Sequence, residues 1–414
     1  MAGTFAPAGN KNAALPMLAA ATLTDEPVTL RNVPSIRDVE VMIELLTGLG
    51  VSAEREGRTV RLCAAGLRRT RLNEALCRQV RSSILLAGPL AARHGRVVLF
   101  PPGGDIIGRR RLDTHRLGLS ALGIEVEGGA HYIFRRRAFR AADMVLDEAS
   151  VTATENTLMA AVLAPGETTI FNAACEPHVA DLGVLLIAMG ARIEGLGTNR
   201  LRVQGVSALH GAEHAIQPDH IEAASFLAAA AVTRGELILA GELDPTAATV
   251  IGRALARLGY AWEKKDAGWT LPARQRRRIM MDEHGIIPRI EDGPWPAFPS
   301  DLMSVFLVLA TQSRGPVLFF EKMFESRMYF VDRLIDMGAR IMPCDPHRVV
   351  VSGPARLHGT ALSSPDIRAG MALILAALAA RGTSTIGHAE IVDRGYEDLA
   401  GRLRALGAEI EREE

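Results

Sequence analysis

The chain has 414 residues, with 47 Lys and Arg against 47 Asp and Glu, so its formal net charge is zero. This length exceeds what one hydrophobic core usually serves and predicts two domains. A neutral chain has no overall field that would steer it to nucleic acid or to a membrane surface, so we expect neither as a partner. Any anion site must therefore come from local clusters of basic residues.

The cysteines and apolar runs narrow the class further. The four cysteines lie far apart with no C-x-x-C pair, which argues against a disulfide framework or a zinc site and favours a cytoplasmic setting. The longest apolar run, residues 371–380, is too short to span a bilayer. The first residues lack the basic start and apolar core of a signal peptide.

Along the chain, a unit of helix, strand, helix, glycine and strand is predicted six times. The first helix of each unit is rich in Ala and other small residues, which predicts helices packed closely at a centre with sheets outside. These helices are expected within residues 10–23, 80–95, 153–166, 221–235, 300–315 and 367–382. Five of these segments end at a glycine and continue into a β-rich run.

The second helix of each unit is predicted to end at a glycine that begins a strand. A glycine just past a helix end fits a left-handed cap, because only glycine adopts positive φ without penalty. The six glycines are Gly50, Gly123, Gly190, Gly259, Gly338 and Gly407. Six units divide into two groups of three, with a boundary near residues 217–220. The fold class is therefore predicted to be α/β, in two domains of similar size.

Charged residues recur where the first helices begin. Lys11 and Asn12 open the first helix, Arg81 the second, Asp301 the fifth and Arg368 the sixth. Helix N-termini carry unpaired N–H groups and partial positive charge, so several that converge predict an anion site. Further arginines expected on loops or turns are Arg110, Arg111, Arg327 and Arg394.

The stretch PPGGDIIGRRRLDTHR, residues 101–116, predicts a sharp loop with Asp105 at its tip. Each of these polar residues also has a simpler interpretation. Asp105 could be only a turn former, and Asp301 could cap its helix together with Ser300. His115 could pack against its neighbours and bind no ligand.

Seven motifs together resemble the UDP-N-acetylglucosamine 1-carboxyvinyltransferases from about residue 8 to the C-terminus. The motifs are NKNAALPMLAA, VRSSILLAGPLAARHG, PPGGDIIGRRRLDTH, SVTATEN, PAFPSDLM, FESRMYFVDRLIDMGA and DRGYEDLAGRLRALGA. The resemblance implies an inside-out α/β barrel of two domains with three repeats each. It implies a first domain at 10–217 carrying a lid loop at about 101–116. The second domain is implied at 218–414 plus 1–9, with the active site in the cleft between the domains.

The resemblance further implies the reaction and its setting. The enolpyruvyl group of phosphoenolpyruvate moves to the 3-hydroxyl of UDP-N-acetylglucosamine and phosphate is released, the first committed step of peptidoglycan synthesis. The enzyme would thus serve cell wall biogenesis, cell shape and cell division in the cytoplasm. Neither a metal nor an organic cofactor is implied, since arginine and lysine supply the positive charge. The sequence makes no prediction of oligomeric state.

The motifs also carry over individual roles. Lys11, Asn12, Arg110, Arg368 and Arg394 match phosphoenolpyruvate positions. The positions that match the sugar nucleotide are Arg81, Arg110, Arg111, Leu112, Asp113, Thr114, Ser150, Val151, Asp301, Met323 and Arg327. Asp301 is the expected base, since a carboxylate is ionised at neutral pH without help.

Asp105 stands where most members of the family have a cysteine that donates the proton. We expect Asp105 to be the proton donor, brought onto the substrate by a lid that Gly103, Gly104 and Gly108 let fold over. Because a carboxylate is a poor target for epoxide alkylation compared with a thiolate, resistance to fosfomycin is also expected.

Three departures leave alternatives open. Few residues precede Lys11, Glu148 and Thr152 fall in a segment expected to hold the nucleotide, and Arg109 and Arg111 make the loop unusually basic. The alternatives are a paralogue acting on a different nucleotide and a non-catalytic sugar-nucleotide-binding protein. A shikimate-phosphate enolpyruvyl transferase is disfavoured, because its GDKS-type and GTAMR-like segments are missing from this sequence.

Overall fold

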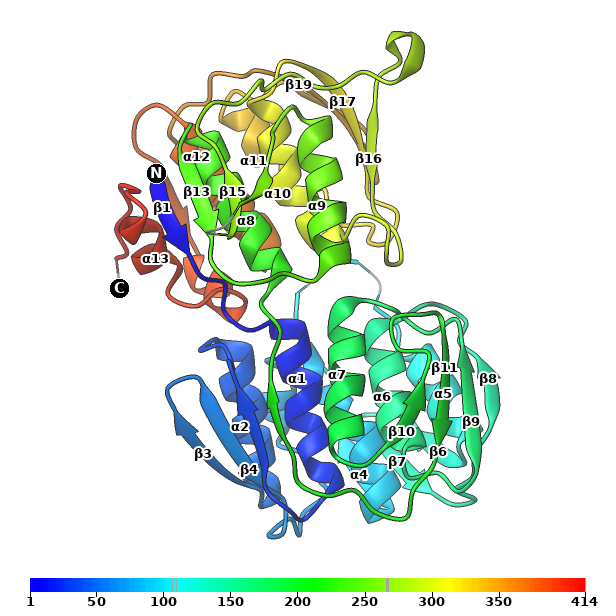
Figure 1. Cartoon of the computed structure of the whole chain (residues 1–414). Helices are drawn as coiled ribbons and strands as arrows, with labels where there is room; N and C mark the ends of the chain where they lie inside the picture. Colours follow the sequence, from blue (N-terminus) through cyan, green and yellow to red (C-terminus); the bar gives the residue numbers. More distant parts are fainter. Residues whose placement is uncertain (106, 109, 266–267, 414) are drawn as a thin grey trace. The chain divides into compact units, whose positions relative to one another are not determined.

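The computed structural model describes residues 1–105, 107–108, 110–265 and 268–413, and the chain divides into two compact units. We name them after one residue of each. The Lys11 unit holds residues 9–105 and 110–217, and the Asp301 unit holds residues 1–8, 107–108 and 218–413. In Figure 1 the Lys11 unit runs from blue to green and most of the Asp301 unit from green to red.

The Lys11 unit alternates helices with short strands. Its helices are α1 (Lys11–Ala20), α2 (Arg37–Leu49), α3 (Glu74–Cys77), α4 (Ala87–His94), α5 (Asp113–Ala121), α6 (Val151–Ala161) and α7 (Pro177–Ala188), with 3₁₀ helices η1 (Ala21–Leu23) and η2 (Arg81–Leu86). Its strands are β2 (Val28–Arg31), β3 (Ser52–Glu56), β4 (Thr59–Cys63), β5 (Arg96–Leu99), β6 (Ile124–Glu127), β7 (Tyr132–Arg136), β8 (Asp143–Val145), β9 (Glu167–Phe171), β10 (Arg192–Glu194), β11 (Arg200–Gln204) and β12 (Glu213–Ala215).

The Asp301 unit follows the same alternation. Its helices are α8 (His220–Val232), α9 (Pro245–Arg257), α10 (Ser300–Thr311), α11 (Val331–Asp336), α12 (Ile367–Ala379) and α13 (Leu399–Ala405), with 3₁₀ helices η3 (Glu283–Gly285) and η4 (Ala389–Arg394). Its strands are β1 (Ala2–Phe5), β13 (Glu236–Leu239), β14 (Glu263–Lys265), β15 (Gly268–Leu271), β16 (Arg289–Glu291), β17 (Gly315–Phe320), β18 (Ile341–Asp345), β19 (Arg348–Gly353), β20 (Ala361–Ser363) and β21 (Thr385–Gly387).

The sheets repeat one pattern of pairing. In four of them an antiparallel set of three strands gains a parallel strand at one edge: β12 beside β2, β8 beside β9, β1 beside β13 and β16 beside β17. The other two sheets, in the order β5-β7-β6 and β20-β21, are smaller. The six sheets stay separate among the described residues, and the predicted α/β class is confirmed.

The first helix of each of the six repeats is buried on nearly all sides. In the Asp301 unit α8, α10 and α12 pack against one another, and every residue of α8 is buried. In the Lys11 unit α1 and α6 pack together, and η2 with α4 joins them. Small Ala side chains allow these helices to approach closely, and helices apolar all round are typical of a core. The prediction of central helices is therefore confirmed within each unit.

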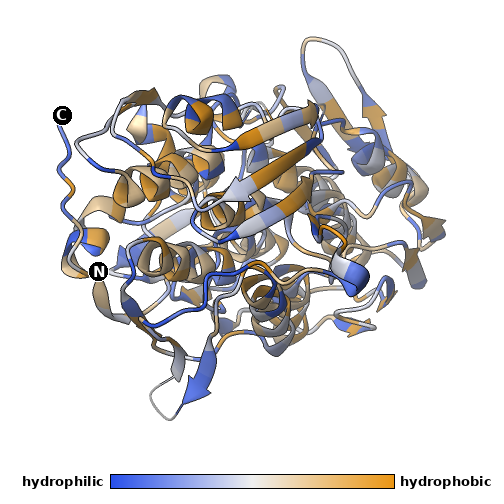
Figure 2. Ribbon diagram, turned by 90° about the horizontal axis from the view of Figure 1, so that it is seen from above, coloured by the Kyte–Doolittle hydropathy of each residue, from blue (hydrophilic) through white to orange (hydrophobic). Residues whose placement is uncertain are grey.

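All six predicted capping glycines have left-handed backbone, with φ between 80° and 104°. A strand follows five of them, but residues 408–413 form no strand, so the prediction of a strand in the sixth repeat was wrong. In the other five repeats that strand pairs antiparallel with the next strand in the chain. The described residues after Gly407 offer no such partner, and they form the largely hydrophilic C-terminal segment seen in Figure 2.

In the part of the chain that the structure describes, none of the helices combines the length and apolar character needed to cross a membrane.

Candidate functional site

Lys11 is the first residue of α1 and directly follows Asn10, the residue that caps the helix. The Asn10 side chain caps the helix by accepting hydrogen bonds from the backbone N–H groups of Asn12 (2.8 Å) and Ala13 (3.2 Å). The Lys11 Nζ atom is 2.8 Å from Asp38 Oδ2, and the two side chains are only 10% and 6% exposed. The predicted cation is thus held in place by a buried carboxylate that the sequence analysis missed.

Arg81 begins η2 and ties down the segment predicted to bind the nucleotide. Its Nη2 donates to the carbonyl oxygens of Arg110 (2.7 Å) and Arg111 (3.3 Å). Burial, and to a lesser degree the charge of Arg110, lowers the pKa of Arg81 to about 10, so its guanidinium stays charged at neutral pH. Arg81 therefore holds the backbone of the chain at Arg110 and Arg111.

The start of α5 carries the rest of that segment. Buried Thr114 donates its hydroxyl to Asp147 (2.6 Å) and to Glu148 (3.2 Å). The Arg111 Nε atom lies 3.4 Å from the exposed Asp113 carboxylate. Glu148 is exposed, so its charge is screened by solvent and does not by itself exclude an anionic ligand nearby.

Ser150 and Val151 lie half-buried at the start of α6, as cap and first residue. His115 packs beside them: its Nε2 is 3.1 Å from Thr152 Oγ1 and its Nδ1 is 3.1 Å from Asn156 Nδ2. Burial, aided by Arg81, lowers the pKa of His115 to about 3, so the ring is neutral. These contacts favour the packing interpretation of His115.

Asp301 is clamped between two predicted arginines in the Asp301 unit. Its Oδ1 accepts from Arg327 Nη2 at 3.1 Å and its Oδ2 accepts from Arg368 Nη2 at 2.7 Å. The Asp301 side chain is 28% exposed, whereas those of Arg327 and Arg368 are 4% and 7% exposed. The Asp301 carboxylate is thus partly accessible to solvent, whereas the two guanidinium groups that hold it are buried.

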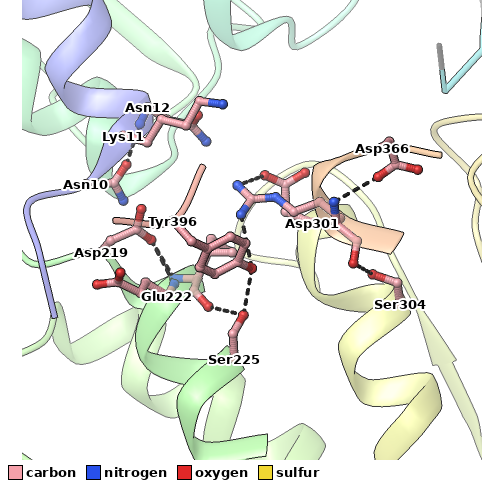
Figure 3. Close-up of polar contacts among 12 residues, drawn as sticks. Asn10, Lys11, Asn12, Asp219, Glu222, Ser225, Asp301, Ser304, Asp366 and Tyr396 are labelled. Atoms are coloured by element: carbon pink, nitrogen blue, oxygen red, sulfur yellow. Dashed lines mark hydrogen bonds and ion pairs between the residues drawn. The ribbon is translucent and has the colours of Figure 1, made fainter. Parts of the chain in front are cut away.

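A second layer of polar groups holds Arg368. Its Nη1 donates to the hydroxyl of buried Tyr396 at 3.4 Å, and that hydroxyl is 2.9 Å from Ser225 Oγ (Figure 3). The Asp366 side chain accepts from the Arg368 N–H at 2.8 Å as the cap of α12. Burial disfavours the charged guanidinium, but Asp301 and Tyr396 raise the pKa of Arg368 above its ordinary value.

Sequence reasoning missed Asp366 and Tyr396 as parts of this network. The Asp of PDIR just before an apolar run is an N-cap signal that could have identified Asp366. Nothing local marks Tyr396, which reaches Arg368 from 28 residues away in the chain.

The predicted lid is described only in part, since Ile106 and Arg109 lie outside the described residues. Asp105, Arg110 and Arg394 are all half-buried. Residues 107–108 belong to the Asp301 unit, where the Ile107 carbonyl accepts from the Ser326 N–H at 3.1 Å. Met323 is 40% exposed, on the segment between β17 and Arg327. The ligand roles of these residues remain predictions.

No group of three or more His, Cys, Asp or Glu side chains within residues 1–105, 107–108, 110–265 and 268–413 is arranged to hold a metal ion.

Comparison with known proteins agrees with this fold. The model of the EPSP synthase (3-phosphoshikimate 1-carboxyvinyltransferase) family matches residues 1–403. Among solved structures, the enolpyruvyl transferase NikO from Streptomyces tendae superposes with a TM-score of 0.86 at 24% identity, covering 99% of this chain and 95% of that one. EPSP synthase from Acinetobacter baumannii gives a TM-score of 0.76 at 19% identity, covering 99% and 96%. These structures share the fold.

Two relatives share a much higher sequence identity with this chain than these solved structures do. The UDP-N-acetylglucosamine 1-carboxyvinyltransferase of Bradyrhizobium diazoefficiens is 52% identical over all of this chain and 96% of the relative. The protein of the same name from Treponema denticola is 50% identical, over all of this chain and 97% of the relative. The chain therefore belongs to the EPSP synthase family of enolpyruvyl transferases, and within it is similar to the branch that carries this name.

Proposed function

We propose that this protein transfers the enolpyruvyl group of phosphoenolpyruvate to the 3-hydroxyl of UDP-N-acetylglucosamine and releases phosphate. Full-length identity of 52% to a relative named for this reaction is the main support. The clamp of Asp301 between Arg327 and Arg368 is the supporting geometry, because it offers a base next to fixed positive charge. The reaction would serve peptidoglycan synthesis in the cytoplasm, and with it cell shape and division.

The reaction is an addition followed by an elimination, with two proton transfers in the addition and one in the elimination. The sugar hydroxyl oxygen bonds to C2 of the enol while its proton leaves, and another proton joins the CH₂ carbon to make a methyl group. Phosphate then leaves from C2 and the methyl group gives a proton back, which restores the double bond. A base near the hydroxyl and an acid near the CH₂ carbon are therefore required.

Asp301 is the base in this proposal. Two buried guanidinium groups donate to its carboxylate oxygens and favour the ionised form. The same charges oppose its protonation, so the proton taken from the hydroxyl must pass on quickly to solvent or phosphate. Arg368 is paired with Asp301 and so is held close to the reacting centre, where it would bind the phosphoenolpyruvate anion.

Asp105 is the proposed proton donor. We expect Asp105 to act as a donor only when the lid of residues 101–116 has closed over the bound substrates. Lys11, Asn12, Arg110 and Arg394 would bind phosphoenolpyruvate.

The sugar nucleotide would bind along the starts of α5 and α6 in the Lys11 unit and along Met323 and Arg327 in the Asp301 unit. A paralogue with another nucleotide is the second candidate, favoured by Glu148 and Thr152, which lie beside Thr114 and His115.

The test is phosphate release from phosphoenolpyruvate with a panel of acceptors. We expect turnover with UDP-N-acetylglucosamine and a kcat/KM at least about 100-fold lower with other sugar nucleotides, since an acceptor site that hydrogen-bonds its substrate rejects analogues that leave those groups unpaired. Preference for another nucleotide would select the paralogue, and no release with any acceptor would select the non-catalytic binding protein.

A further inference from the structure

Two buried carboxyl groups lie behind the Asp301 clamp and have no part in the mechanism above. Asp292 and Glu321 are both 0% exposed. They follow directly on β16 and β17, which are parallel and in register up to Glu291 and Phe320. The register therefore brings the two carboxyl groups side by side where the strands end, and their side chains lie within hydrogen-bonding range of each other.

Glu321 organises the turn that leads to Arg327. Its carboxyl accepts from the backbone N–H groups of Met323 (3.2 Å) and Phe324 (3.1 Å), and from the Ser300 hydroxyl at 2.9 Å and 3.0 Å. Asp292 Oδ1 accepts from the Lys322 N–H at 2.5 Å. The pair thus fixes three successive backbone N–H groups beside the predicted nucleotide position Met323.

Glu321 also faces the clamp itself. Its Oε2 lies 3.8 Å from Arg327 Nε, and the other end of that guanidinium donates to Asp301 at 3.1 Å. Asp301 contacts both guanidinium groups, Glu321 lies near that of Arg327, and Asp292 lies beside Glu321. Three carboxyl groups thus share two guanidinium groups. Full ionisation would leave one uncompensated negative charge in a buried cluster, which is costly.

One proton on the pair removes that imbalance and supplies a missing donor. Asp292 Oδ2 is buried and no donor among the described residues reaches it. A hydrogen bond between two carboxyl groups requires that one of them be protonated. Burial, and then the neighbouring Asp292, raises the pKa of Glu321 to about 9, which agrees with a proton held at neutral pH.

We propose that Asp292 and Glu321 share one proton, and that this singly charged pair is a positioning element that aims Arg327 at Asp301 and sets the Met323 turn. The inference rests on the proposed function. Both residues are 0% exposed, so their effect on turnover passes through Arg327 and the turn.

Four variants test the shared proton. Glu321→Gln and Asp292→Asn each keep the shape and leave the pair with one negative charge, so each should retain kcat/KM within about threefold of wild type. Glu321→Gln with Asp292→Asn removes that charge and should lower kcat/KM about 10- to 100-fold, as misplaced catalytic groups do. Glu321→Ala should lower kcat/KM at least as much. Because Glu321→Gln should retain activity, the loss in Glu321→Ala would not be explained by the missing charge of Glu321 alone. Glu291→Gln, in the strand before Asp292, is the matched control and should be unchanged.

A measurement on the wild type keeps the test independent of folding in the variants. Infrared spectra at neutral pH should show a protonated carboxyl band that is missing from both single variants. Burial also raises the pKa of Glu155 well above its ordinary value. Subtracting the spectrum of a single variant from that of the wild type removes the band of Glu155, which is present in both. The proposal is overturned if either single variant loses as much activity as Glu321→Ala, if the folded double variant is fully active, or if the difference band is missing. Turnover by the wild type tests the proposed function separately.

Discussion

Lys11 and Asp38 form an ion pair inside the Lys11 unit, with Nζ 2.8 Å from Oδ2 and both side chains at most 10% exposed. Asp38 lies in the first turn of α2, so the pair joins the starts of two helices. The pair stabilises this part of the fold, and in the proposed function the same cation also binds phosphoenolpyruvate.

Replacing Lys11 by Met should separate these two roles. The loss of a buried ion-pair partner should cost about 3–5 kcal/mol in the free energy of unfolding, measured by denaturant titration. The kcat/KM for phosphoenolpyruvate should fall about 100-fold or more, as when a charge-stabilising group is removed. The double variant Lys11→Met with Asp38→Leu should regain stability but not turnover. Full activity in either variant contradicts the assigned role of Lys11.

Asp105→Asn should lower kcat by about 100-fold or more, because the amide cannot donate the proton. Phosphate release measures the effect. Asp105→Cys should restore a donor and become covalently inactivated by fosfomycin, whereas the wild type should resist it. Rapid covalent inactivation of the wild type, or full turnover by the Asn variant, removes Asp105 from the mechanism.

Asp301→Asn should reduce kcat about 100-fold or more while the KM for phosphoenolpyruvate changes much less. The amide oxygen can still accept from one arginine, so the fold should persist. Asp345→Asn is a suitable control, since Asp345 pairs with Arg348 in the β18–β19 hairpin. An effect on KM alone would show that Asp301 binds substrate without acting as a base.

Stability should depend on pH through Glu321. Its pKa is raised from 4.5 to about 9 by burial first and then by Asp292, while Arg327 opposes the rise. Between these pH values the folded protein binds a proton that the unfolded chain has lost. The contribution of this group to stability is therefore present at low pH and declines as pH rises from about 4.5 to about 9.

Glu321→Gln removes that proton. The free energy of unfolding of the wild type minus that of the variant should thus fall across this range, as measured by denaturant titration at several pH values. His347, which contacts the Glu321 backbone carbonyl through Nδ1, is present in both proteins and cancels. A difference that is flat or rises with pH shows that Glu321 is ionised in the folded protein.

The repeat architecture could be predicted from sequence because its signals are local. Gly50 and Gly338 carry the left-handed caps that their positions after a helix imply, and Ala-rich segments became the buried helices. The missing sixth strand shows the limit of this reasoning. Residues 408–413 have an alternating pattern, but a strand forms only where a partner strand offers hydrogen bonds.

The candidate site was predicted in outline, with its supporting partners left out. Asp301, Arg327 and Arg368 were identified from separate motifs, and the fold brings them together. Asp38 and Glu321 were missed because their role depends on contacts that no spacing in the sequence encodes. Burial of a charged side chain is a property of the packed fold, and it determines which residues must pair.

The most direct test of the whole account is the product formed from phosphoenolpyruvate labelled with carbon-13 at C3, incubated with UDP-N-acetylglucosamine and the wild-type protein. We expect NMR to show a labelled CH₂ group in a vinyl ether on the 3-oxygen of the sugar, together with one free phosphate per product. Unchanged labelled phosphoenolpyruvate, or a vinyl ether formed only on another acceptor, would contradict the account.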